Sequence, residues 1–242
     1  MLLNPKQAKA LYRDALEHGY AILAVNADSP ACMTDCLVAA KACAAPLIIE
    51  TSLWQLEGRS FGAGNAALGM QRYLAQLAVL ANDEAFRDVP VAYHTDHIKG
   101  PLTRDLLTHA IRGFRFEAEG QAVLLSPSSV SLDASELSEE ENIELISILA
   151  ATAEESGRPV CLEMESAIDE GLTTKDEAAR LLGPVETKHP DAVEVWAPGL
   201  GTRHGLGGDG YPEFSVDHVR DHVNWAREIT GRNIGLALHG SS

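Results

Sequence analysis

The sequence predicts an α/β fold of the (β/α)8 TIM barrel type, with the eighth βα unit absent from this chain. Runs of apolar, β-rich residues alternate with helix-like segments, which favours right-handed crossovers and a parallel sheet. No Gly-x-Gly-x-x-Gly follows the first strand, so a dinucleotide-binding open sheet is disfavoured. Reactive side chains follow several strands, as expected of a barrel. We therefore expect one domain, residues 1–242, incomplete at its C-terminal side.

The predicted elements follow one another along the whole chain. The expected strands are Tyr20–Ala27, Pro46–Ser52, Val89–His94, Ser129–Asp133, Pro159–Glu165, Ala192–Pro198 and Asn233–His239. The expected helices include Asn65–Leu80, Leu102–Ala110, Glu139–Glu155, Lys175–Leu182 and Asp217–Thr230. Ser138 precedes three glutamates and Ser215 precedes Val-Asp, so both serines are predicted helix N-caps.

Composition excludes several classes of partner. The formal net charge of −16 repels nucleic acid and anionic membranes, whereas an anionic small molecule can still bind through a local metal or backbone N–H groups. Hydrophobic residues make up 45% of the chain and aromatic residues only 5%, which suits a helix-covered parallel sheet. Four cysteines do not form a disulfide framework, and no secretory signal or membrane-spanning run is apparent. We expect a cytoplasmic protein.

Histidines at strand ends indicate a metal site. His97, His204 and His239 each follow a predicted strand. Three imidazoles with an open fourth position are a catalytic zinc arrangement, so these three are the candidate Zn²⁺ ligands. His94 shares the first of these strand ends and is interpreted as a supporting residue. The remaining histidines are expected to face solvent: His18, His109, His189, His218 and His222.

Acidic residues lie close to these histidines in the sequence. Asp96 sits between His94 and His97, where it could bond a ligand histidine or act as a general acid. Glu163 and Glu165 share one face of a predicted strand, and buried carboxylates are costly unless paired. Two further patterns are weaker, because they also suit an acidic turn and a flexible tail. These are the loop acids Asp169 and Glu170, a possible proton shuttle, and the small residues Gly240–Ser242, whose N–H and hydroxyl groups suit phosphate oxygens.

Six landmarks, in order, resemble the zinc-dependent class II aldolases that act on fructose and tagatose bisphosphates. His94-Thr-Asp-His97 resembles the His-x-Asp-His signature of that family, which is its most specific motif. The other five landmarks, in chain order, are Ala24-Val-Asn26, Ser131-Leu-Asp133 with Glu140-Glu-Asn142, Leu162-Glu-Met-Glu165, Arg203-His-Gly205 and Leu238-His-Gly-Ser-Ser242.

The resemblance implies reversible aldol cleavage of a phosphorylated ketose, similar to fructose 1,6-bisphosphate, into dihydroxyacetone phosphate and an aldehyde. This is carbohydrate metabolism of the glycolytic kind, with a zinc-bound enediolate as intermediate. It further implies one Zn²⁺ per chain, in some cases with a monovalent cation, and a homodimer or homotetramer. By the resemblance, Asp96 is the catalytic acid, Glu170 or, less well, Asp169 is the loop acid, and the zinc ligands are His97, His204 and His239. Asp133 and Glu165 correspond to a secondary metal site or to site support. The residues that bind substrate and phosphate are Asn26, Ser52, Gly205, Gly240 and Ser242.

Two departures from the family leave other functions open. The eighth strand, with its Asn-x-Asp-Thr motif, is missing, and Glu50 and Trp54 differ from the familiar bisphosphate enzymes, so the substrate is expected to differ. A metal-dependent hydrolase on the same barrel would use zinc-bound water as its nucleophile. A non-catalytic, aldolase-like binding protein is the third possibility, and the missing unit favours it.

Overall fold

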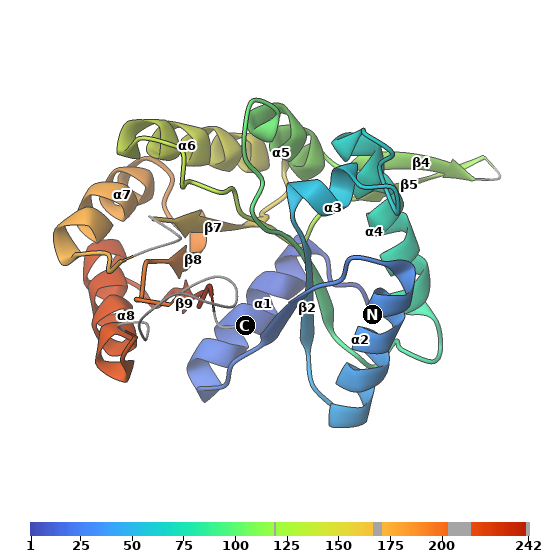
Figure 1. Cartoon of the computed structure of the whole chain (residues 1–242), viewed down its shortest axis with the longest axis horizontal. Helices are drawn as coiled ribbons and strands as arrows, with labels where there is room; N and C mark the ends of the chain where they lie inside the picture. The colour runs from blue at the N-terminus through green and yellow to red at the C-terminus, as the bar shows by residue number, and fades with distance from the viewer. Residues whose placement is uncertain (119, 167–170, 203–213, 241–242) are drawn as a thin grey trace, which may run out of the picture.

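The computed structural model describes residues 1–242 except 119, 167–170, 203–213 and 241–242. The described chain forms a curved, seven-stranded parallel sheet in the order β1-β2-β3-β6-β7-β8-β9, with helices along its outer side (Figure 1). The strands are β1 Leu23–Asn26, β2 Leu47–Thr51, β3 Val91–Thr95, β6 Ser129–Val130, β7 Cys161–Glu165, β8 Val193–Ala197 and β9 Gly235–Leu236. The helices are α1 Pro5–His18, α2 Pro30–Cys43, α3 Leu53–Glu57, α4 Ala66–Asn82, α5 Thr103–Arg112, α6 Glu139–Ser156, α7 Lys175–Lys188 and α8 Val216–Thr230.

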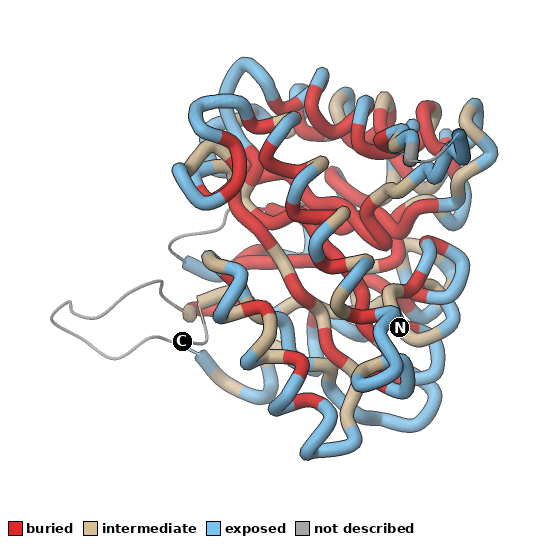
Figure 2. Tube along the Cα trace, turned by 90° about the vertical axis from the view of Figure 1, so that its right-hand side faces the viewer, coloured by how far each residue is buried: buried red, intermediate tan, exposed pale blue. Residues whose placement is uncertain are grey.

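The core lies between the sheet and the surrounding helices. Figure 2 shows buried residues concentrated in the interior and exposed residues on the outer turns. Every residue of β3 and β7 is buried, as expected for parallel strands covered on both faces. Tyr73 of α4 stacks on Tyr93 of β3 with ring centroids 5.3 Å apart, and Trp196 fills the core under β8. This packing fixes the strands whose ends carry the polar groups described below.

Capping side chains set several helix starts, as the sequence predicts. Ser138 caps α6 and forms a reciprocal capping box with Glu141, and Ser215 caps α8 through the His218 backbone N–H. Three glutamates in the first turn of α6 also stabilise the helix, because their negative charges lie at the positive end of its dipole. Local sequence therefore determines where these two helices begin.

Helix α1 covers the amino ends of the strands. The Leu3 backbone N–H donates to the Val91 carbonyl at 2.8 Å, and the Ser128 hydroxyl donates to the Leu3 carbonyl at 2.7 Å. Leu3 precedes α1, and within the helix the Tyr12 hydroxyl lies 2.9 Å from the Ser129 hydroxyl of β6. These contacts close the end of the sheet opposite the strand termini that carry histidine.

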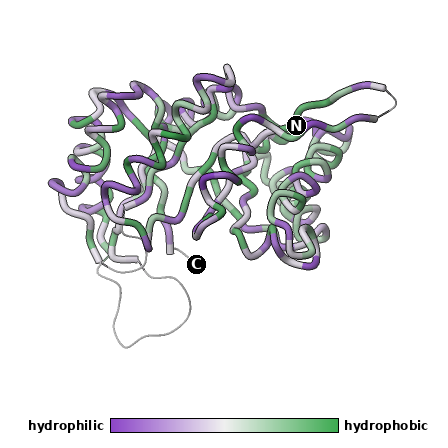
Figure 3. Tube along the Cα trace, turned by 90° about the horizontal axis from the view of Figure 1, so that it is seen from above, coloured by the Kyte–Doolittle hydropathy of each residue, from purple (hydrophilic) through white to green (hydrophobic). Residues whose placement is uncertain are grey.

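Three features differ from the sequence-based expectations. An antiparallel hairpin, β4 Phe114–Ala118 and β5 Gln121–Leu125, projects from the body (Figures 1 and 3), although its alternating Phe114 and Phe116 were a strand signal. The short helix α3 was also not predicted. The expectation that His189 and His222 face solvent is wrong: they are 6% and 2% exposed, because each lies on the core side of its segment. His18 and His109 are exposed and His218 is half-buried.

The α/β fold with a parallel sheet is confirmed, whereas barrel closure is not established. Within the described residues, no pairing joins β9 to β1, so the sheet has two open edges. Leu23 of β1 is 69% exposed, consistent with an uncovered edge strand. The absence of an eighth βα unit stays a prediction.

Candidate active site

A cavity of about 1190 Å³ opens along the inner face of the curved sheet. Its lining combines the inner surface of α1 with side chains at the carboxyl ends of β1, β2, β3, β7 and β9. Its polar lining includes Asn26, Glu50, Asp96, His97, Glu163 and His239. Because parallel strands end at one side of a sheet, residues far apart in sequence meet here.

Asp96 and His97 form the centre of this site. Both follow the end of β3, and the Asp96 backbone N–H is anchored by the Thr51 carbonyl of β2 at 2.9 Å. His97 adopts a left-handed backbone, φ +48°, which is strained for a non-glycine residue and is common at functional sites. This turn brings its Nδ1 within 2.6 Å of Asp96 Oδ1.

The Asp96–His97 pair stabilises its own charges. Burial alone would raise the pKa of Asp96, which is 5% exposed, but the hydrogen bond and charge of His97 outweigh burial and lower the pKa to about 2. Reciprocally, the hydrogen bond to Asp96 raises the pKa of His97 to about 9 despite partial burial. Asp96 is therefore an ionised carboxylate at neutral pH when no metal is bound.

His239 approaches the same point from the edge of the sheet formed by β9. It follows β9, and its ring centroid lies 5.4 Å from that of His97. Its Nε2 is 3.1 Å from Oε1 of Glu163, a buried β7 carboxylate. Burial alone would lower the pKa of His239, but the Glu163 hydrogen bond and charge raise it to about 10. Both imidazoles are thus oriented by a carboxylate, as metal-binding histidines usually are.

Glu165 adds a second carboxylate on the same strand. It is 1% exposed, its Oε1 accepts from the Ser131 hydroxyl at 2.7 Å, and its Oε2 has no hydrogen-bond partner among the described residues. Burial raises its pKa to about 8. A register shift in the β7–β8 ladder lies beside Glu163, where an irregularity can re-aim side chains.

Two sets of side chains in this site have a spacing suitable for a divalent ion. Within each set, potential ligand atoms lie within 4.8 Å of one another. The first set is Asp96, His97 and His239; the second is Glu163, Glu165 and His239. Imidazole with carboxylate is a donor set suited to Zn²⁺. Asp133 is in neither set: it lies 3.5 Å from the Lys99 ammonium and accepts from Ser135.

The predicted substrate-binding side chains surround Asp96. Asn26, at the end of β1, places its amide nitrogen 3.2 Å from Asp96 Oδ2, and the Ser52 hydroxyl lies 3.3 Å from the same oxygen. Ser52 is the N-cap of α3, so that helix fixes its position. Gly240 follows His239 with φ +64°, a conformation that glycine adopts without strain.

Several predicted site residues lie outside the described residues. These are the zinc ligand His204, the loop acids Asp169 and Glu170, and the phosphate-binding residues Gly205 and Ser242. The described part of the chain therefore brings together Asp96, His97 and His239 from the predicted catalytic and metal-binding set.

The structure adds polar residues to the site that the sequence did not place there. Glu50, which the sequence marked only as a departure from the family, lines the cavity from β2, where burial and the nearby Asp96 charge raise its pKa to about 8. The Ser129 hydroxyl lies 2.8 Å from Nδ1 of the supporting residue His94, and the Tyr12 hydroxyl lies 2.9 Å from the Ser129 hydroxyl. An isolated serine or tyrosine gives no sequence signal for such contacts, because the partners lie on separate elements.

Comparison with known proteins identifies related chains. The family model described as fructose-bisphosphate aldolase class-II matches residues 6–242. A fructose-bisphosphate aldolase of Helicobacter pylori is 29% identical over 204 residues, covering 81% of this chain and 56% of that protein. The corresponding protein of Mycoplasma pneumoniae is 26% identical over 246 residues, covering 100% of this chain and 73% of its own length.

Solved structures show the same similarity. The crystal structure of a fructose-bisphosphate aldolase from Campylobacter jejuni matches with a TM-score of 0.77 and 25% identity, covering 99% of this chain and 70% of that one. The aldolase YdjI from Escherichia coli matches with a TM-score of 0.64 at 21% identity, a likeness of fold alone. The chain spans little more than half the length of the Helicobacter pylori relative.

Proposed function

The chain belongs to the class II fructose-bisphosphate aldolase family, and we propose that it catalyses reversible aldol cleavage of a phosphorylated ketose. The products would be dihydroxyacetone phosphate and an aldehyde. One observation carries the proposal: the Asp96 carboxylate and the imidazoles of His97 and His239 converge in one cavity, although they come from opposite parts of the sheet. Cleavage needs a proton acceptor beside a group that polarises a ketone, and this arrangement supplies both kinds of residue.

The residues fit a Zn²⁺ ion. His97, His239 and, outside the described residues, His204 would hold it. Oε2 of Glu165, which has no hydrogen-bond partner in the described part of the chain, is a further potential oxygen ligand close by. Such an ion, when bound, supplies Lewis-acid polarisation of the substrate carbonyl. Glu165 and Asp133 would support the site or a second metal position. A monovalent cation is part of the same proposal.

Asp96 would move the proton at the aldehyde half. In the cleavage direction its carboxylate accepts the hydroxyl proton of the carbon that becomes the aldehyde; in condensation it returns that proton. Asn26 and Ser52, both bonded to the second Asp96 oxygen, orient the carboxylate and would contact substrate. Glu170 would exchange the proton on the carbon of the dihydroxyacetone phosphate half.

Small residues would bind the substrate phosphate. Gly240, with positive φ, follows a metal-binding candidate directly and exposes backbone at the strand end. Gly205 and Ser242 complete this part of the proposal. Each lies next to, or within three residues of, a candidate zinc ligand, so phosphate and metal would be bound by the same turns.

The two open edges of the sheet support the proposal that the chain folds as a single TIM-barrel domain. β1 and β9 each lack a neighbour on one side among the described residues. Apolar side chains next to these edges, including Leu23 and Leu238, are exposed at 69% and 43%. An eighth parallel strand between them would cover these side chains and satisfy both edges.

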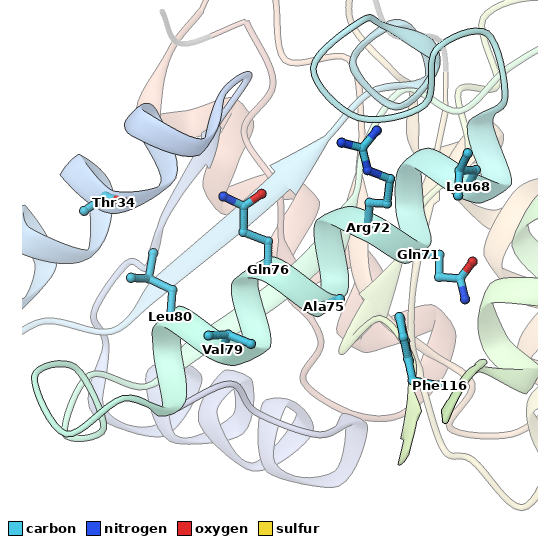
Figure 4. Close-up of a pocket in the computed structure, with 9 residues that line it drawn as sticks. All are labelled: Thr34, Leu68, Gln71, Arg72, Ala75, Gln76, Val79, Leu80 and Phe116. Carbon is cyan, nitrogen blue, oxygen red and sulfur yellow. The ribbon is translucent and has the colours of Figure 1, made fainter. Parts of the chain in front are cut away.

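We also propose a cytoplasmic homodimer or homotetramer that binds neither nucleic acid nor membrane. An apolar hollow on the outer face of α4 supports self-association (Figure 4). It includes Val79, 78% exposed, and Phe116 of the hairpin. None of the helices that the structure describes is long and apolar enough to cross a membrane. Sedimentation analysis of the wild type and Val79→Asp tests the assembly, which the charge should weaken.

An enzyme-coupled assay tests the catalytic proposal. The Zn²⁺-loaded protein is incubated with ketose mono- and bisphosphates, and dihydroxyacetone phosphate is measured through NADH oxidation, with and without chelator. The proposal expects metal-dependent release of dihydroxyacetone phosphate. Stoichiometric zinc without turnover of any ketose phosphate would instead favour a binding protein, and hydrolysis without carbon–carbon cleavage would favour the hydrolase.

A further inference from the structure

A buried glutamine joins the two side chains that hold Asp96. Gln55 is the third residue of α3 and is 3% exposed. Its Oε1 accepts from the Ser52 backbone N–H at 2.7 Å, which is one half of a capping box at the start of this helix. The same Oε1 accepts from the Asn26 amide nitrogen at 3.4 Å. One glutamine oxygen therefore binds both Ser52 and Asn26, which in turn bond Oδ2 of Asp96.

The Ser52 backbone N–H determines the orientation of both amide side chains. A backbone N–H only donates, so the Gln55 atom that faces it is the oxygen Oε1. That oxygen only accepts, so Asn26 must turn its Nδ2 toward it. The same Nδ2 lies 3.2 Å from Asp96 Oδ2 and 3.5 Å from the Ser52 hydroxyl oxygen. A flipped Asn26 amide would instead set its oxygen against the oxygen of Gln55.

The nitrogen of the Gln55 amide supports this orientation. Nε2 of Gln55 is buried and has no hydrogen-bond partner in the part of the chain that the structure describes. An unpaired buried donor costs stability and requires an explanation. Turning the Gln55 amide over would not help, because Nε2 would then face the Ser52 N–H and leave that donor unpaired as well. The orientation that holds Asn26 is therefore the stable one.

We propose that Gln55 is a positioning residue for aldol cleavage: it holds Nδ2 of Asn26 against Asp96 and leaves Oδ1 of Asn26 available to a substrate hydroxyl. This inference rests on the catalytic role of Asp96 in the proposed function. Asn26 is an exposed residue of the cavity lining, and its Oδ1 forms no hydrogen bond with any residue that the structure describes. A reacting group that is oriented before substrate binds lowers the barrier of the chemical step.

Two capping glutamines provide a matched test. Gln55→Met removes Oε1 of Gln55 with little change in the size of the side chain. The control is Gln7→Met, because Gln7 accepts from the Asn4 backbone N–H at 3.0 Å and makes the same type of bond at the start of α1, outside the cavity lining. Both variants lose a bond to an N-cap backbone, but only Gln55→Met also releases Asn26. Urea unfolding and zinc content show whether each variant retains the fold and the metal site.

Steady-state cleavage of a ketose phosphate should separate the two variants. Gln55→Met should lower kcat about tenfold and change KM by less than about threefold, because the groups proposed to bind metal and phosphate are retained. Gln7→Met should keep both constants within about twofold of the wild type. In an Asn26→Ala background, Gln55→Met should lower kcat by less than about threefold, because the residue through which Gln55 acts is gone. An unchanged kcat in Gln55→Met, or the same loss in both backgrounds, would overturn the positioning role.

A spectroscopic measurement tests the amide orientation without substrate. The side-chain NH₂ signals of Asn26 in a ¹H–¹⁵N NMR spectrum are assigned by their loss in Asn26→Ala. Gln55→Met should shift these signals and speed their exchange with water, whereas Gln7→Met should leave them in place. Unchanged Asn26 signals in Gln55→Met would overturn the inference whether or not the protein is active. Failure of the wild type to cleave any ketose phosphate, with the Asn26 signals shifted as expected, would instead refute the proposed function, while the hold of Gln55 on Asn26 would stand.

Discussion

Substitution of Asp96 by asparagine separates proton transfer from the remaining functions of the site. Asparagine has nearly the same shape. Its carbonyl oxygen can still accept the hydrogen bonds that the Asn26 amide and the Ser52 hydroxyl donate to Asp96. It cannot accept the hydroxyl proton of the substrate. Asp96→Asn should therefore retain the cavity and lose the chemistry.

The expected size of this loss follows from general acid–base catalysis. A positioned acid or base contributes roughly 10²- to 10⁴-fold in rate, or about 2.7–5.4 kcal/mol of barrier. The change in stability should be smaller. Loss of the charge-assisted bond to His97, 2.6 Å long, costs about 1.5–3 kcal/mol, and relief of a buried charge offsets part of it.

Steady-state cleavage, zinc content and urea unfolding of the variant test this prediction together. The matched control is Glu186→Gln, which removes a carboxylate bonded to Arg232 at 3.0 and 3.2 Å outside the cavity. The control should lose stability but retain turnover. Turnover of Asp96→Asn within tenfold of the wild type, at full zinc occupancy, would refute the assigned role.

Three further predictions concern the metal, pH and packing. Chelation should abolish turnover, and added Zn²⁺ should restore it. Zinc binding should release protons, because the pKa values of metal-free His97 and His239 are raised to about 9 and about 10. Zinc binding without proton release would contradict the assignment of these histidines as ligands. These folded-state pKa values exceed the unfolded value of about 6.5, so the two histidines stabilise the metal-free protein fully below pH ~6.5. That contribution is lost as pH rises to about 10, so the denaturant midpoint should fall over this range. A midpoint that rises would contradict the raised pKa values of the two histidines. Gly69→Ala should lower the free energy of unfolding by about 1–3 kcal/mol, because its Cβ would lie 1.9 Å from the Leu56 carbonyl oxygen. As the control, Gly183→Ala meets nothing closer than 4.0 Å and should be neutral or stabilise α7 by up to about 1 kcal/mol. Equal unfolding midpoints for both variants would show that α3 and α4 are not packed as described.

The sequence predicted the strands that carry the site because their signals are local. β3 and β7 are apolar runs that end in polar residues, and the structure places both within one residue of the predicted carboxyl ends. Helix starts at Ser138 and Ser215 depend on side chains that contact their own first turn. Such features require no knowledge of distant partners.

Other features depend on contacts between distant segments and left little trace in the sequence. The β4–β5 hairpin turns at Gly120, φ +77°, but its alternating pattern is short and lies between stronger helix signals. His222 is buried against Trp196, a partner 26 residues away, so its position on α8 alone suggested solvent. Ser129 gains significance only from Tyr12 and His94, which lie on other elements.

The candidate site was predicted through its motif and only partly through its chemistry. His94-Thr-Asp-His97 identified Asp96 and His97. The carboxylate that orients His239 is Glu163, for which the sequence indicated a role in the site but no partner. Orientation by a carboxylate depends on tertiary structure, which explains why the sequence indicated the ligands better than their supporting residues.

Zinc-edge anomalous diffraction from crystals of the Zn²⁺-loaded protein tests the central claim most directly. The account predicts one strong peak in the cavity beside Asp96, about 2.0–2.1 Å from a ring nitrogen of His97 and of His239. Zinc bound elsewhere, or these two rings left without an ion between them at full occupancy, would contradict it.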